Sequence, residues 1–237
     1  MTLEVCVDSI ATAEIAAAAG ADRIELCSVL SVGGVTPTAS LIRHVVRAVS
    51  VPVIVLVRCK PGAFYYSSAE KLLMLDEIRE AIEAGASGVA VGSLIRSNSS
   101  SGDAIDLDAD FLSALTASAP GDCELVMHRA FDEVSDHAAS LETLIQLGFT
   151  RVLTSGGRPT AIEGSDRLGA LHRQAAERIT ILPGGGVRGK NAAELLKRTG
   201  CRELHGSFRI GIGDSLPDAG EIVAAQAALS DARPRAI

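Results

Sequence analysis

Short apolar runs alternate with longer amphipathic stretches along most of the chain. Four segments repeat one pattern, in which a helix-like stretch is followed by a glycine, two further residues and a strand-like run. The glycines are Gly20, Gly85, Gly148 and Gly200. Glycine suits the left-handed position just past the C-terminus of a helix, and a strand follows at once, so each segment is typical of an αβ unit.

Four further strand-like runs lie between these units and begin at Leu3, Val51, Cys123 and Ile179. Together the two sets predict eight strands that alternate with helices, at about thirty residues per unit. Such regular alternation over 237 residues favours a barrel over a doubly wound sheet. We therefore predict the α/β class and a single-domain (β/α)8 TIM barrel at residues 1–230, with a mobile C-terminal tail at residues 231–237.

Two connections are long and lack a clear period, at residues 59–70 and 96–106. Both follow strands, so in a barrel they lie at the C-terminal face, where functional sites are built. The first contains Phe64 and both tyrosines and is suited to cover a ligand. The second is rich in serine, and a flexible loop is a simpler interpretation than a lid.

Composition excludes several classes of partner. A net charge of −7 disfavours binding to nucleic acid or to an anionic membrane. The longest apolar run ends at Arg58 and is too short to span a bilayer. The first residues show no secretion signal, and the five cysteines do not form a disulfide framework. Reduced thiols in a cytoplasmic protein are the simplest interpretation.

Alternation along the strands places polar side chains inside the barrel, because the apolar set must face the helices. On the last strand Glu203, His205 and Ser207 share this inward face. The lower residues of this polar set suit an ion-paired plug, in which Arg23 neutralises Glu4 or Glu203. The upper residues fall at strand ends, where a substrate can reach them. They are Cys6, Glu25, Cys27, Arg58 and His128.

Glycine-rich turns follow the last three predicted strands, at residues 154–157, 183–187 and 205–207. Backbone N–H groups in such turns converge on anions, and this is the usual phosphate site of TIM barrels. The predicted anion-binding residues are Arg129, Ser155, Gly156, Gly184, Gly185, Gly186 and Ser207. The alternative is that tight turns between strands and helices simply need glycine.

Seven motifs between residues 3 and 209 together resemble the CutC family of copper homeostasis proteins. They read LEVCVDS, GADRIELCS, GGVTP, HRAFDEV, LTSGG, PGGGV and ELHGSFR. The resemblance implies a cytosolic TIM barrel that handles copper, with Cys6 and Cys27 as Cu(I) ligands. Alternation along the strands independently puts both thiols in the lumen on adjacent strands, and thiolates are ligands that Cu(I) prefers. Two inert core cysteines are the alternative. We also expect a homo-oligomer.

The segment after the third strand departs from the family pattern Arg-Pro-Arg-x-Gly-Asp-Phe. It keeps Arg58, Gly62 and Phe64, but Cys59 replaces the proline and Ala63 replaces the acid. Cys59 is thus a third thiol near the predicted mouth, which either extends a metal site or has no role.

Two functions follow. The first is copper homeostasis through a Cu(I) site. The second is an enzyme of lyase, isomerase or hydrolase type acting on a small anionic or phosphorylated molecule. For the enzyme we predict His128 as general acid or base, turned into the mouth towards Glu25 and Arg58, with Glu25 or Asp132 assisting it. Arg58, Arg129 or the glycine turns then hold the anion. A structural alternative is that Asp132 or Asp136 only caps the following helix.

Overall fold

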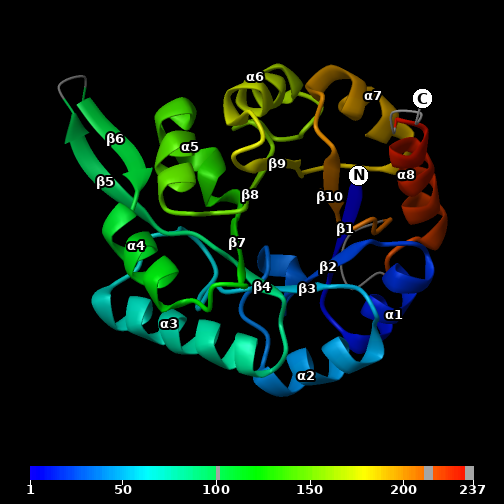
Figure 1. The fold of residues 1–237 in the computed structure, drawn as a ribbon, viewed down its shortest axis with the longest axis horizontal. Coiled ribbons are helices and arrows are strands. Elements are labelled where there is room, and N and C mark those ends of the chain that lie inside the picture. The colour runs from blue at the N-terminus through cyan, green and yellow to red at the C-terminus, as the bar shows by residue number, and fades with distance from the viewer. Residues whose placement is uncertain (100–101, 211–215, 233–237) are drawn as a thin grey trace.

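Eight parallel strands surround a central axis in the computed structural model, which describes residues 1–99, 102–210 and 216–232 (Figure 1). The apolar runs form these strands because each is buried on both sides, by the lumen and by the helices. The strands are β1 (Thr2–Val7), β2 (Arg23–Leu26), β3 (Val53–Leu56), β4 (Gly88–Val91), β7 (Glu124–Met127), β8 (Arg151–Thr154), β9 (Thr180–Pro183) and β10 (Glu203–Gly206). The predicted (β/α)8 TIM barrel is confirmed.

The strands are hydrogen-bonded in the order β10-β1-β2-β3-β4-β7-β8-β9. The barrel is nearly closed rather than fully closed, because the described residues of β9 and β10 form no ladder with each other. We call this line between β9 and β10 the seam.

Helices surround the barrel on the outside (Figure 1). They are α1 (Ile10–Ala18), α2 (Ala39–Ala48), α3 (Ser68–Glu83), α4 (Ala109–Ser118), α5 (His137–Gln146), α6 (Ser165–Ala175), α7 (Gly189–Thr199) and α8 (Ala219–Asp231). The four glycines of the repeat lie just past helix ends with φ between 73° and 99°, which is the left-handed region. A residue with a Cβ is strained there, so glycine ends each of these helices.

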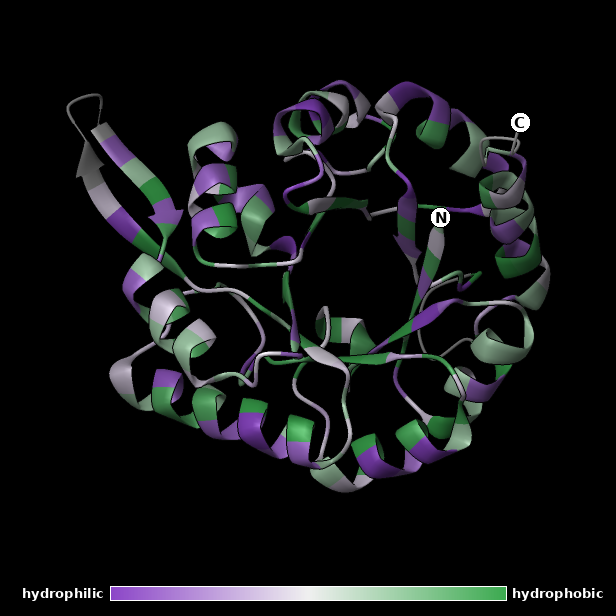
Figure 2. Ribbon diagram, in the orientation of Figure 1, coloured by the Kyte–Doolittle hydropathy of each residue, from purple (hydrophilic) through white to green (hydrophobic). Residues whose placement is uncertain are grey.

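The apolar core lies between the strands and the helices. Leu3, Val5 and Val7 of β1 are fully buried in it, as the alternation of residues predicted. Figure 2 shows both hydrophobic and hydrophilic residues on the outer helices, as expected where one face packs on the strands and the other meets water.

The prediction of a loop at residues 96–106 was wrong for residues 96–99 and 102–106, and residues 100–101 lie outside the described residues. An antiparallel hairpin of β5 (Leu94–Ser99) and β6 (Gly102–Leu107) projects from the barrel there (Figure 1). Its serines and aspartates favour turns, but Ser135 docks the hairpin on the barrel. The Ser135 N–H donates to the Ile105 carbonyl at 2.9 Å, and the Ser135 hydroxyl oxygen accepts from the Ile105 N–H at 2.9 Å.

Residues 59–67 are irregular, as expected, and α3 begins behind a capping box of Ser67 and Glu70. At the C-terminus Asp231 ends α8, and residues 233–237 of the predicted tail lie outside the described residues. Within the described ranges, no helix is both long and apolar enough to cross a membrane.

Candidate functional site

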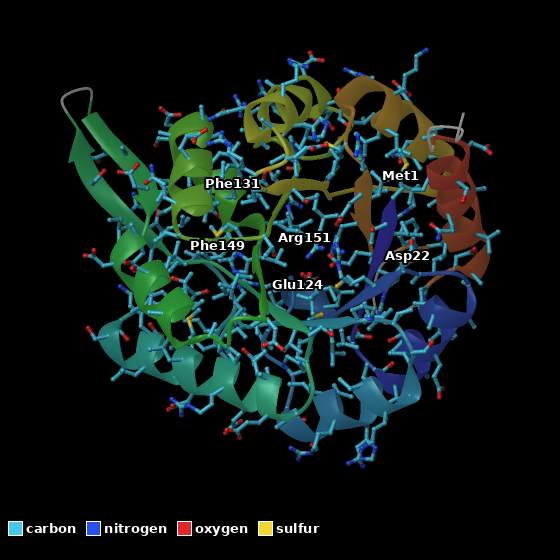
Figure 3. The ribbon with its side chains drawn as sticks, viewed as in Figure 1. Met1, Asp22, Glu124, Phe131, Phe149 and Arg151 are labelled. Atoms are coloured by element: carbon cyan, nitrogen blue, oxygen red, sulfur yellow. The ribbon has the colours of Figure 1, made fainter. Side chains whose placement is uncertain are left out.

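An ion-paired plug fills the N-terminal half of the lumen, as predicted. Arg23 Nε lies 2.5 Å from Glu4 Oε2, and Arg23 Nη2 lies 2.6 Å from Glu203 Oε2. Arg151 continues the chain, since it contacts Glu203 at 3.0 Å and also pairs with Glu124. Figure 3 shows Glu124 and Arg151 in the barrel interior. Arg23 therefore neutralises both predicted carboxylates rather than one of them.

His205 lies above this plug and contacts two carboxyl groups. Its Nδ1 is 2.7 Å from Glu4 Oε1, and its Nε2 is 3.8 Å from Glu25 Oε2. Burial alone would raise the pKa of Glu4, but Arg23 and His205 outweigh it and lower this pKa to about 2. Burial would lower the pKa of His205, but Glu25 and Glu4 raise it. The two carboxyl groups thus favour the imidazolium form of His205 beside an ionised Glu4.

The two predicted metal ligands lie next to this imidazole. Cys6 Sγ is 3.9 Å from Cys27 Sγ, and both side chains are buried. Ligand atoms of Cys6, Glu25 and His205 all lie within 4.8 Å of one another. The Cys27 thiol, burial and the Glu25 carboxyl raise the pKa of Cys6, so the free thiol keeps its proton at neutral pH. Burial likewise raises the pKa of Glu25.

A cavity of about 170 Å³, which we call the mouth pocket, opens above the thiols. Five of the residues that line it are predicted site residues, and His205 lines it as well. They are Cys6, Glu25, Arg58, His128, Arg129 and His205. The structure therefore gathers five of the thirteen predicted site residues in one place, at the C-terminal end of the barrel.

His128 faces the mouth pocket as predicted, but it contacts no carboxylate. Its Nδ1 accepts a hydrogen bond from the Ala130 N–H at 3.2 Å, and its ring lies 4.8 Å from the Phe64 ring. Burial and the nearby Arg58 charge lower the pKa of His128 to about 3. His128 is therefore neutral at physiological pH, and it is His205 that meets Glu25.

Arg58 lies at the edge of the pocket, where it joins two loops. Its guanidinium donates to the carbonyls of Val32, Gly34 and Gly62, at 3.3, 3.0 and 2.5 Å. It also lies 4.9 Å from the centre of the Phe64 ring. These contacts position the residues that cover the pocket.

Asp132 lies away from His128 and binds the turn after β8. Its carboxylate accepts from the N–H groups of Ser155 and Gly157 at 2.9 Å and from Arg129 Nε at 2.8 Å. The Gly156 N–H donates to Thr154 Oγ1 at 2.9 Å. This turn has the anion-binding geometry that was predicted, but an internal carboxylate occupies it. Asp136 caps α5 through the N–H groups of residues 138 and 139, as the structural alternative proposed.

The remaining predicted anion ligands are spread along the rim. The Gly184 N–H donates to the Thr154 carbonyl at 3.0 Å. Gly185 has a φ of 100°, and a Cβ there would lie 3.2 Å from Arg129 Nη1, so the guanidinium packs directly on this glycine. Gly186 and Ser207 make no contact with Arg129 or Ser155 among the described interactions. Arg129, Ser155 and Gly185 are thus together, and the others are separate.

Cys59 does not extend the thiol pair. It is partly buried against the core near Glu70 and Glu77 of α3, and burial raises the pKa of its thiol. His205 is the functional candidate that sequence reasoning placed in the lumen without giving it a role. The signal was its position on the same strand face as Glu203.

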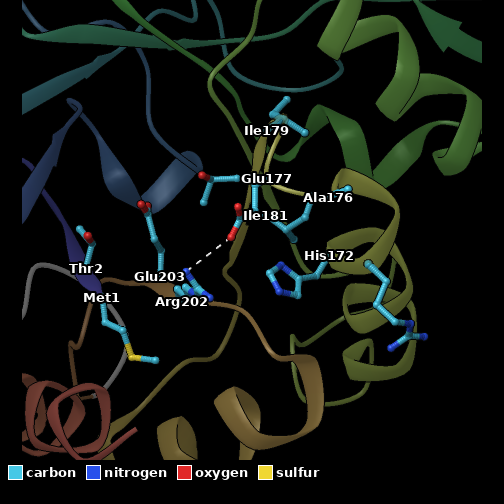
Figure 4. Close-up of a pocket in the computed structure, with 11 residues that line it drawn as sticks. Met1, Thr2, His172, Ala176, Glu177, Ile179, Ile181, Arg202 and Glu203 are labelled. Carbon is cyan, nitrogen blue, oxygen red and sulfur yellow. Dashed lines mark ion pairs between the residues drawn. The ribbon is translucent and has the colours of Figure 1, made fainter. Parts of the chain in front are cut away.

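A larger cavity of about 530 Å³ lies at the opposite, N-terminal face of the barrel (Figure 4). Ile179 just before β9, Ile181 of β9 and Glu203 of β10 line it, so it follows the seam. Its rim carries an exposed ion pair, with Arg202 Nη1 3.7 Å from Glu177 Oε1. It holds none of the predicted site residues, and the mouth pocket is the stronger candidate.

Comparison with known proteins agrees with the motif pattern. The model of the CutC family matches residues 1–210. The chain is 42% identical over 207 residues to the human copper homeostasis protein cutC homolog, covering 87% of this chain and 73% of the human protein. It is 44% identical over 205 residues to a Pasteurella multocida family protein CutC, covering 86% of this chain and 81% of that protein.

Solved structures give the same result. The putative copper homeostasis protein CutC from Streptococcus agalactiae superposes with a TM-score of 0.80 at 31% identity, covering 87% of this chain and 99% of that chain. Phosphoribosyl anthranilate isomerase from Thermus thermophilus, with a TM-score of 0.60 at 15% identity and coverage of 98% and 100%, shares the fold alone. With a family match over most of its length and a shared barrel, the chain belongs to the CutC family.

Proposed function

We propose that the protein binds Cu(I) through Cys6 and Cys27 and acts in copper homeostasis. The observation that carries this proposal is the distance of 3.9 Å between the two buried sulfurs. Metal–thiolate bonds are about 2.3 Å long for Zn²⁺, so two thiolates on opposite sides of one ion are at most about 4.6 Å apart. The pair therefore needs only a small side-chain movement to hold an ion, and Cu(I) prefers such soft ligands.

Copper binding requires each thiol to release its proton. Glu25 lies beside Cys6 and is the nearest group able to accept one, since its own pKa is raised by burial. His205 is engaged with Glu4 as an imidazolium, so it is not a ligand in this state. The proposed site is thus a two-thiolate site with Glu25 as its proton acceptor.

Reduced thiols are needed for this site, so we infer that the protein works in a reducing compartment such as the cytoplasm. All five cysteines are free thiols in the structure, which supports this inference. The expected homo-oligomer also remains a prediction, which size-exclusion chromatography with light scattering tests.

The copper proposal is tested by competition with a chromophoric Cu(I) chelator under reducing conditions. Wild-type protein is expected to bind one Cu(I), and Cys6→Ser and Cys27→Ser are each expected to lose most of the affinity. Cys59→Ser is the matched control, because Cys59 faces α3, and it is expected to bind as the wild type does. Unchanged binding in the Cys6→Ser/Cys27→Ser double variant rules the site out.

A second candidate function is proton-transfer catalysis on a small anionic molecule, of lyase, isomerase or hydrolase type. The observation that favours it is the His205 imidazole 3.8 Å from the Glu25 carboxyl group, both facing the mouth pocket and both with a raised pKa. In this proposal His205 and Glu25 carry the proton, while Arg58 and Arg129, which line the same pocket, supply positive charge for the anion. Proton exchange from D₂O into small carboxylates and phosphorylated compounds, followed by NMR, is expected in wild-type protein and not in His205→Gln.

A further inference from the structure

The hydrogen bond from the Ala130 N–H determines which ring nitrogen of His128 carries the proton. The Ala130 backbone N–H is only a donor, so His128 Nδ1 must accept with its lone pair. The ring is neutral because burial and Arg58 lower its pKa to about 3. A neutral imidazole carries one proton, so here Nε2 is an N–H donor. It has no lone pair for a metal ion, and His128 is therefore not a copper ligand in this arrangement.

This Nε2–H donor has no acceptor among the protein atoms that the structure describes. The His128 side chain is almost fully buried, and it lines the mouth pocket. A buried donor without a partner costs about 1 to 3 kcal/mol, so such groups in native proteins usually serve a ligand or a function. The position calls for an oxygen acceptor inside the pocket.

Arg58 adds a second, independent observation. The residue is only 6% exposed, and no carboxylate lies within 4.0 Å of its guanidinium among residues 1–99, 102–210 and 216–232. Three carbonyls accept its N–H groups, but they carry no net charge, and Nε has no acceptor. Buried charges in proteins are normally paired, so this site lacks a counterion. Arg129, in contrast, is already paired with Asp132.

Phe64 connects the two groups. Its ring lies 4.8 Å from the His128 ring and 4.9 Å from the Arg58 guanidinium, so both line the same side of the pocket. The remaining walls are largely apolar, with Leu30, Leu56 and Leu153. Apolar walls favour an anion that carries a carbon skeleton over inorganic phosphate. The nearby Glu25 disfavours a second negative charge on the ligand.

The size of the pocket limits the ligand. Liquid water occupies about 30 Å³ per molecule, so 170 Å³ corresponds to roughly six non-hydrogen atoms. We propose that the mouth pocket binds a small organic monocarboxylate, with His128 Nε2–H donating to a ligand oxygen and Arg58 balancing its charge. This site goes beyond copper binding and does not depend on it. The ligand is a candidate substrate or a partner of the metal site.

The test uses metal-free wild-type protein in the presence of a chelator, with pyruvate as the probe. Pyruvate has about the size that the pocket admits and offers both a carboxylate and a carbonyl oxygen. Titration followed by ¹⁵N-resolved NMR of the histidine side chains is expected to shift the His128 Nε2–H signal in a saturable way. Pyruvamide, the neutral analogue, is expected to bind roughly tenfold or more weakly, since it lacks the charge that Arg58 balances.

Matched variants locate the binding. His128→Phe keeps an aromatic ring beside Phe64 and removes the donor, and it is expected to weaken pyruvate binding roughly tenfold or more. His137→Phe is the control, because His137 also packs on a phenylalanine and also has an unpartnered Nε2, but does not line the pocket. It is expected to bind as the wild type does.

Three outcomes overturn the proposal. They are the absence of saturable pyruvate binding to wild-type protein, equal binding of pyruvate and pyruvamide, and phosphate binding that displaces pyruvate with higher affinity. The first two outcomes are measured on wild-type protein alone, so the proposal can be overturned even if a variant fails to fold. Because copper is excluded from these measurements, their result is separate from that of the Cu(I) competition.

Discussion

His128 and His205 line one pocket, and their pKa values are shifted in opposite directions. Burial lowers the pKa of His128 to about 3, and Arg58 adds to the effect. His205 is as deeply buried, yet the Glu25 and Glu4 carboxyls raise its pKa. Two imidazoles at one site thus differ because one has carboxylate neighbours and the other does not. The neutral ring suits hydrogen bonding to a ligand, and the charged ring suits proton donation.

The His128 pKa has a consequence for stability. The folded pKa lies below the unfolded value of 6.5, so the unfolded chain binds a proton that the folded chain excludes. This contribution to stability is present above pH 6.5 and is lost as the pH falls towards 3. Between pH 6 and pH 4 the unfolding free energy of the wild type should fall about 1.4 kcal/mol per pH unit more steeply than that of His128→Phe.

Urea unfolding of both proteins at several pH values measures this difference. His205 has the opposite sign, since its raised pKa stabilises the fold below pH 6.5 and this contribution is lost as the pH rises through the folded value. It is present in both proteins and cancels in the comparison. Parallel curves for the two proteins between pH 6 and pH 4 would contradict the neutral state of His128.

Sequence alternation was enough to place His128, His205 and Arg23 in the lumen. It was not enough to predict which imidazole meets a carboxylate, because that depends on how neighbouring strands are aligned. Glu4 lies opposite His205 on β10 and opposite Arg23 on β2. These strands are far apart in the chain, and no local pattern states their register. The prediction therefore paired His128 with Glu25 or Asp132, whereas the imidazole that meets Glu25 is that of His205.

At the scale of elements, the turn after β8 binds a carboxylate of the protein itself, that of Asp132. Asp132 comes from the short 3₁₀ helix Arg129–Glu133 and accepts from the N–H groups of Ser155 and Gly157. The glycine-rich sequence predicted that the backbone N–H groups of this turn point towards one anion, and those of Ser155 and Gly157 do. It did not predict an internal acceptor, because the acceptor lies more than twenty residues away in the chain.

Removing that carboxylate should open the turn. Asp132→Ala is expected to destabilise the protein by about 1 to 3 kcal/mol, because the two N–H groups lose their acceptor. Phosphate should then recover part of the loss in thermal unfolding, whereas it should leave the wild type unchanged. Asp136→Ala is the control, since it removes a helix cap worth about 1 kcal/mol and creates no anion site. Equal phosphate responses in both variants would contradict this account.

The hairpin of β5 and β6 is the element that sequence reasoning missed. Periodicity located the barrel strands because each is four to six residues of mostly apolar sequence buried on two sides. Five of the twelve described hairpin residues are serine, asparagine or aspartate, and asparagine and aspartate have low strand propensity. A tertiary contact to Ser135 contributes to their conformation, and such contacts are invisible to local patterns.

At the scale of the whole molecule, ion pairs take the place of the branched apolar residues that usually fill a barrel, but only in the N-terminal half of the lumen, and Ile54, Val126 and Leu182 belong to a separate apolar cluster. Arg23→Met leaves Glu4 and Glu203 without their shared partner and is expected to cost about 3 to 5 kcal/mol in the free energy of urea unfolding. Arg202→Met is the matched control, because its pair with Glu177 is exposed, and it should cost less than about 1 kcal/mol. Equal losses would mean that the interior pairs are no more important than surface ones.

The position of Glu203 gives the seam a further meaning. Glu203 belongs to β10 and binds Arg151 of β8, which lies on the other side of the seam beyond β9. Side chains inside the lumen thus join the two ends of the sheet where the main chain does not. The seam is thus closed by side chains and not by backbone hydrogen bonds. Widening the barrel along the seam would break ion pairs and would leave every interstrand ladder intact. The same ion pairs continue through Arg23 to Glu4 and His205, so the seam and the floor of the mouth pocket share one network of side chains.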